Sequence, residues 1–152
     1  MLSRLFDLLG SKAKQEELPD EDRLQVATCV ILLEVAGADD EFSPEECERI
    51  VGAMRERFGL SQEEAEELIR VSQERRAQSF DLWKFTNQIN QSCANAEKIR
   101  IIEEVWRVIF ADGTLDGHED YLVHKLARLL NLNHPQLIDA KMAVLKETRG
   151  TG

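Results

Sequence analysis

One sequence pattern occurs twice in this chain, 73 residues apart, and it restricts the possible folds more than any other feature. Each copy consists of a strongly apolar segment, a short acidic turn and an amphipathic segment. The two acidic turns span residues 38–46 and 111–119. A supersecondary unit that is repeated in this way predicts a structure assembled from two equivalent parts.

Apolar residues recur at helical spacing throughout the chain, and no stretch alternates as a strand would. The helices expected before the two turns, at about 20–37 and 96–110, are apolar on nearly every side, which is typical of helices buried at the centre of a domain. The remaining helices are expected at about 43–59, 61–75, 81–92, 116–130 and 133–146. The sequence therefore predicts an all-α fold: a single compact helical domain of about seven helices, in two pseudo-repeated units of buried helix, acidic turn and amphipathic helix.

The predicted helical domain covers residues 20–147, and a chain of 152 residues is long enough to bury one sizeable core. Residues 1–19 are expected to form a short amphipathic helix that docks on the core, followed by a polar linker. Anchoring to a membrane or a partner is the alternative for this first helix. Residues 148–152 are expected to be a disordered tail. No apolar run approaches the roughly 20 residues that a transmembrane helix needs.

The charge of the chain is strongly negative and concentrated in one stretch. The net charge is -10, and residues 34–74 contain 13 Asp and Glu against 4 Arg and no Lys, which gives -9 there. Such a surface repels phosphate backbones, so nucleic acid is excluded as a ligand, and it attracts cations or basic protein partners. A protein partner is therefore expected.

The three cysteines are Cys29, Cys47 and Cys93, and none of them forms a pair with the spacing of a zinc or redox motif. Unpaired thiols of this kind are typical of a reducing compartment. The sequence therefore predicts a cytoplasmic protein.

Carboxylates at matching places in the two turns are the candidate metal ligands. Asp39 and Glu46 stand seven residues apart in the first turn, as do Asp112 and Glu119 in the second. Oxygen ligands in turns suit hard divalent cations, which makes calcium or magnesium the expected cofactor. The secondary candidates are Asp40, Glu41, Asp116 and Asp120.

An EF-hand does not fit either turn. Its loop requires a glutamate at position 12, which is Val123 when counted from Asp112 and Ile50 when counted from Asp39. A cation site would therefore have to be assembled between the two turns. Whether the turns meet depends on whether the two central helices run side by side in the same direction.

Helix capping is the alternative explanation for the two glutamates. Ser43 with Glu46, and Asp116 with Glu119, have the spacing of a capping box, in which the glutamate accepts a hydrogen bond from a backbone N–H at the helix start. The aspartates Asp39 and Asp112 fit this explanation less well. Each follows a helix end, where negative charge is unfavourable.

Sequence motifs of catalysis are missing. There is no serine elbow, phosphate-binding loop or dinucleotide glycine pattern, and the residue four after His118 is Leu122, so no zinc-protease motif forms. His124 and His134 are interpreted as surface or cap residues. The aromatic residues Phe80, Trp83, Phe85 and Trp106 are interpreted as core. No enzyme activity is predicted.

The doubled motif, VAGADDEFSPEE and FADGTLDGHE, resembles the TerB family of tellurite-resistance proteins over about residues 20–141. The resemblance implies an all-helical, pseudo-repeated fold whose acidic residues form a cation-binding surface. Carried over, it nominates Asp39, Glu46, Asp112 and Glu119. Asp40 stands where the family usually has glycine, so the first turn departs from the pattern. The family name describes a resistance phenotype and implies no enzyme activity.

Two functional hypotheses follow. The first is a cytoplasmic, non-enzymatic, TerB-like stress-response module whose acidic surface binds a divalent cation, a protein partner or both, with a peripheral place at the membrane face. The second is a plain helical protein-interaction scaffold whose acidic turns are only helix caps. Its partner site would lie elsewhere, for instance on the acidic helix at 61–74 or on the amphipathic N-terminus.

Overall fold

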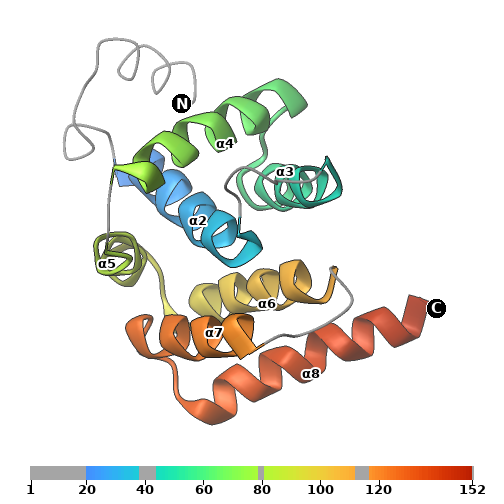
Figure 1. The fold of residues 1–152 in the computed structure, drawn as a ribbon. Coiled ribbons are helices and arrows are strands. Elements are labelled where there is room, and N and C mark those ends of the chain that lie inside the picture. Colours follow the sequence, from blue (N-terminus) through green and yellow to red (C-terminus); the bar gives the residue numbers. More distant parts are fainter. Residues whose placement is uncertain (1–19, 38–43, 79–80, 112–116, 152) are drawn as a thin grey trace.

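The computed structural model describes residues 20–37, 44–78, 81–111 and 117–151, and of residues 20, 21, 117–119 and 148–151 it describes the backbone alone. This described part of the chain is all α, as the sequence predicts, and it contains no strand (Figure 1). Its helices are α2 (Asp20–Ala36), α3 (Pro44–Phe58), α4 (Gln62–Ala77), α5 (Trp83–Ser92), α6 (Asn95–Ala111), α7 (Gly117–Leu129) and α8 (His134–Thr151).

The helix ends differ from the predicted ones by at most two residues, except at the end of α8. This helix runs to Thr151, past its expected end near residue 146 and through most of the segment expected as a tail. The physical reason lies in its sequence, because no glycine or proline stands between Pro135 and Gly150 to end the helix.

The two predicted units are visible in the packing of the helices. In the first unit α2 packs against both α3 and α4, and α3 packs against α4; in the second, α6 packs in the same way against α7 and α8, and α7 against α8. Helix α5 connects the units and contacts α2 and α7. The central helices α2 and α6 pack against each other and so join the two units into one domain (Figure 1).

Equivalent backbone turns precede α4 and α8. Gly59 and Asn131 both have positive φ, 67° and 61°, a left-handed conformation that glycine and asparagine tolerate best. Two residues later each helix begins with a capping box. In α4 the Ser61 side chain accepts from Glu64 N–H and the Glu64 carboxylate accepts from Ser61 N–H, and α8 repeats this arrangement with Asn133 and Gln136.

Helix α2 forms the centre of the hydrophobic core. Residues 26–33 all have an exposed fraction of 0%, which confirms the prediction that this helix is buried on every side. It is covered by α3, α4, α5 and α6. Full burial of apolar side chains of this size stabilises a domain by roughly 1.5–3 kcal/mol each relative to exposure.

Helix α6 is buried on fewer sides than its sequence suggests. Ile101, Ile102, Val105 and Trp106 are buried, but Glu104 and Arg107 on the same helix are only partly so. The second unit has fewer helices around its central helix, because α5 contributes mainly to α2. One edge of α6 is therefore polar.

The prediction that the aromatic residues lie in the core is confirmed for Phe85 and Trp106, which are each 1% exposed. It is wrong for Trp83, which is 55% exposed. Trp83 starts α5, whose buried face contains Phe85, Thr86, Gln88 and Ile89, so its ring points away from that face. Phe80 lies outside the described residues.

Candidate functional site

Most of the predicted metal ligands belong to segments that the structure does not describe. Those outside the described residues are Asp39, Asp40, Glu41, Asp112 and Asp116. For Glu119 the backbone is part of α7 and the side chain is outside the description. Of the candidates, Glu46 and Asp120 therefore remain with a described side chain.

Glu46 and Asp120 begin the helices that follow the two acidic turns. Glu46 is partly buried in the first turn of α3, beside the exposed Glu45. The Asp120 carboxylate is 52% exposed, with one oxygen 3.6 Å from His124 Nδ1. Within the described ranges no three His, Cys, Asp or Glu side chains come together in a way that could hold a metal ion. A site with three or more such ligands would need residues of the turns themselves.

The packing of the central helices bears on whether the two turns approach each other. Helices α2 and α6 contact each other, and in Figure 1 both run with their C-terminal ends toward the right of the view. Each helix that follows a turn also packs on the central helix of the other unit, since α3 contacts α6 and α7 contacts α2. A site shared between the two turns requires contacts of this kind, in which the helix after each turn packs on the central helix of the other unit.

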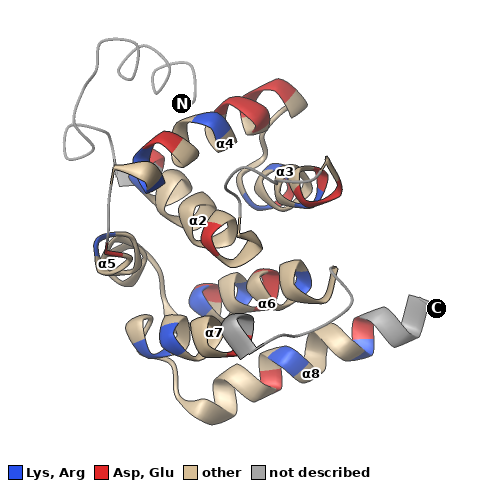
Figure 2. Cartoon of the chain, viewed as in Figure 1, with Lys and Arg blue, Asp and Glu red and all other residues tan. Residues whose placement is uncertain are grey.

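Acidic residues are concentrated in α3 and α4, the helices that follow the first turn (Figure 2). Residues 44–67 contain eight glutamates against three arginines, which gives a charge of -5. We call the exposed surface of these two helices the α3–α4 face and define it by the carboxylates Glu45, Glu48, Glu63, Glu66 and Glu74. The exposed Glu56 is not part of it, because it lies beside Glu104 and Arg107 of α6. It is the region of the described chain to which a cation or a basic partner segment would be attracted.

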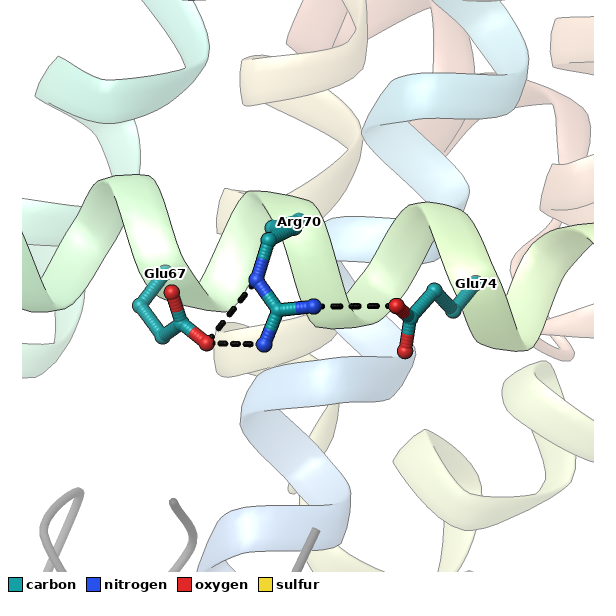
Figure 3. A network of polar contacts seen from close by, with 3 residues as sticks. All are labelled: Glu67, Arg70 and Glu74. Atoms are coloured by element: carbon teal, nitrogen blue, oxygen red, sulfur yellow. Dashed lines mark hydrogen bonds and ion pairs between the residues drawn. The ribbon is translucent and has the colours of Figure 1, made fainter. Parts of the chain in front are cut away.

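One arginine partly neutralises the far end of the α3–α4 face. The Arg70 guanidinium lies between Glu67 and Glu74 on α4 and forms ion pairs with both (Figure 3). The hydrogen bond from Arg70 lowers the pKa of the Glu67 carboxyl group. Because Arg70 is 56% exposed, solvent screens the network and its contribution to stability is small. Nearer the start of α4, Glu63 and Glu66 form no ion pair with any described residue, so less of the negative charge is balanced there.

The three cysteines lie in surroundings that make their thiols less acidic. All three are free, and burial raises the pKa of Cys29 to about 12. Burial also raises the pKa of Cys47 and of Cys93. A raised pKa reduces the fraction of thiolate near neutral pH, and the thiolate is the nucleophilic and metal-binding form.

The structure reveals a residue pair that the sequence interpretation missed. The rings of His124 on α7 and His134 at the start of α8 stack with centroids 5.9 Å apart. The His124 Nδ1 atom lies 2.8 Å from the backbone oxygen of Asp120, an atom that can only accept, so Nδ1 carries the proton. The two histidines are ten residues apart across a helix hairpin, and this separation has no recognisable motif.

The fold and its charge define the class of this protein: an all-helical module of two equivalent units, with an acidic face beside the first of the repeated turns. The comparison with protein families makes this specific, because the family model described as Tellurite resistance protein TerB matches residues 25–142. The chain belongs to the TerB family. No curated protein and no solved structure matches it significantly. None of the described helices is both long and apolar enough to cross a membrane.

Proposed function

We propose that this protein is a non-enzymatic stress-response module of the tellurite-resistance type, in which the two acidic turns form one surface that binds a divalent cation. Calcium or magnesium is the expected ion, because the candidate ligands Asp39, Glu46, Asp112 and Glu119 all offer carboxylate oxygens. The observation that supports the proposal is that α3 contacts α6 and α7 contacts α2, so that the helix after each turn packs on the central helix of the other unit.

The bound cation would couple to a protein partner through the neighbouring α3–α4 face. The charge of this face favours a basic partner segment and disfavours direct contact with anionic lipid head groups. We place the protein in the cytoplasm, and any peripheral association with the membrane face would go through such a partner or through the amphipathic segment at residues 1–19.

A titration with calcium chloride or magnesium chloride, followed by backbone amide NMR shifts of the full chain, tests the cation site. We expect saturable shifts in both turns together, with a Kd no weaker than the millimolar range. The variant Asp39→Asn with Asp112→Asn should lose them. The matched control, Glu63→Gln with Glu66→Gln, removes the same charge from α4 and should keep them. Unchanged shifts in both turns at millimolar metal would refute the cation site.

The second candidate function is a helical scaffold whose turns are only caps, and one observation favours it. Capping boxes begin both α4 and α8, so capping boxes that include Glu46 and Glu119 would repeat an arrangement already present in this chain. Glutamine can also serve a capping box. The variant Glu46→Gln with Glu119→Gln should therefore leave stability within about 1 kcal/mol under either function, and only a lost metal response would show that the two are ligands.

A further inference from the structure

Helix α8 lies at the edge of the molecule, where it packs against α6 and α7 (Figure 1). Its buried face contains Leu137, Ala140 and Val144, which are three and four residues apart. On the same side of the helix, Glu147 accepts hydrogen bonds from Arg107 of α6. This side therefore joins α8 to the rest of the domain.

A second row of apolar side chains follows another side of the same helix. Ile138, Met142 and Leu145 are four and three residues apart, the spacing that the a and d positions of a coiled coil have along one helix face. Met142 is 53% exposed, and Ile138 and Leu145 are partly exposed. Neither Ile138 nor Leu145 is among the partly buried side chains that pack against the described core. We call these three residues the α8 stripe, and part of each side chain stays uncovered by the described residues.

Two opposite charges flank the α8 stripe on the side away from the buried face. Asp139 and Lys146 are seven residues apart, about two helical turns, so they lie on one line beside the stripe. Both are exposed, and neither forms a hydrogen bond or an ion pair with a described residue. The midpoint between these two charges and the midpoint between Ile138 and Leu145 both lie next to Met142. The stripe is therefore apolar at equal distances on both sides of Met142, with a negative charge before it and a positive charge after it.

We infer that the α8 stripe is a contact between two copies of this chain, in which the two α8 helices run antiparallel about a two-fold axis at Met142. Such a contact uses the same surface on both copies, so the surface must be complementary to itself. The α8 stripe meets this condition, because an antiparallel neighbour places Ile138 of one copy opposite Leu145 of the other. It also places Asp139 of each copy opposite Lys146 of the other, which gives two ion pairs. A parallel pair in register would put like residues at the same height and form neither ion pair, so charge complementarity selects the antiparallel second copy.

The contact is small, since each copy contributes three partly exposed apolar side chains and two charges. Interfaces that bury less than about 1,200 Å² belong to weak and transient complexes, so we expect a Kd between about 10 µM and about 1 mM. The ion pairs are exposed and therefore determine the orientation of the two helices more than the affinity. In Figure 1, α4 and α8 lie at opposite edges of the molecule, so the pairing leaves the carboxylates of α4 accessible in both copies.

Sedimentation equilibrium of the full chain, at concentrations from about 10 µM to about 2 mM, tests the pairing. We expect the average mass to rise with concentration from 17.4 kDa toward twice this value. Met142→Glu places two like charges at the axis and should weaken the association at least about tenfold. The matched control Trp83→Glu makes a similar change at an exposed apolar side chain outside α8 and should leave the association unchanged. Both positions are exposed, so the variants should fold, which circular dichroism verifies.

Charge reversal tests the antiparallel orientation. Asp139→Lys alone and Lys146→Glu alone should each weaken the association about three- to tenfold, because each places like charges opposite each other. A mixture of these two variants should associate at least as tightly as the wild type, since one copy is then positive at both positions and the other is negative at both. Lys84→Glu, which reverses an exposed charge on α5, is the control and should have no effect. A mixture that associates no more tightly than its separate variants would overturn the inference.

Three other outcomes would also overturn it. Association that Met142→Glu leaves unchanged would place the contact between copies elsewhere on the molecule. A wild-type chain that stays monomeric at about 2 mM, in which Met142→Glu shifts the backbone amide signals of residues 2–9, would show that the N-terminal segment of the same chain covers the α8 stripe. A monomer in which this variant shifts only signals of α8 would leave the stripe to a different protein.

Discussion

Trp106 offers the sharpest quantitative test of how the second unit is held together. Its side chain is 1% exposed, stacks on Phe110 with ring centroids 5.5 Å apart, and donates its indole N–H to the Leu137 oxygen at 3.2 Å. The Lys141 ammonium lies 5.4 Å from the centre of the ring. One side chain of α6 thus contacts α8 by a hydrogen bond and by a cation–π contact, while its ring stacks within α6.

The substitution Trp106→Phe keeps an aromatic ring but removes the N–H and part of the buried volume. Losing the hydrogen bond should cost about 1 kcal/mol. The smaller ring adds about 1–2 kcal/mol in lost transfer free energy and cavity formation. The free energy of unfolding should therefore fall by about 2–3 kcal/mol. For a chain of this length that corresponds to a decrease in Tm of about 4–12 °C.

Urea unfolding followed by circular dichroism measures this loss, and the second tryptophan supplies the control. Trp83→Phe is the same chemical change at a side chain that is 55% exposed, so it should alter stability by less than about 0.5 kcal/mol. Fluorescence gives a second readout, because the variant that keeps only Trp106 should emit at shorter wavelength than the one that keeps only Trp83. Equal losses for the two variants would refute the role assigned to Trp106.

Three further predictions concern stability and reactivity. Arg107→Met removes the cation beside Glu104, whose pKa is raised by burial, and should cost about 1–3 kcal/mol at pH 8. A carboxyl group whose pKa is raised in the folded state loses its stabilising contribution as the pH rises through that pKa. Glu104 should therefore need the arginine less at pH 5, and the free energy lost in Arg107→Met should be smaller there than at pH 8. Equal losses at the two pH values in urea unfolding would contradict this. Ser61→Ala removes the α4 capping box and should cost about 1 kcal/mol in thermal unfolding, whereas a neutral effect would count against the cap. Cys29, with its pKa raised to about 12, should resist iodoacetamide at pH 8 until the protein unfolds, while the partly exposed Cys47 reacts first; mass spectrometry of the labelled peptides gives the order.

The candidate site could be predicted only in part. The acidic turns are recognisable because they recur at equivalent places, and the match to the TerB family confirms the family resemblance. Their role as cation ligands stays a prediction. The stacked pair of His124 and His134 could not be predicted, because the two rings belong to two helices and become neighbours only when the hairpin closes.

The sequence by itself determined the helices and the way they begin. Continuous apolar residues in α2 and the capping boxes at Ser61 and Asn133 act over three or four residues, so they can be recognised without a fold. The tertiary structure decided which sides of those helices are covered. Trp83 is exposed and α6 has a polar edge because burial depends on which helices pack on each face, and those contacts join residues far apart in the chain.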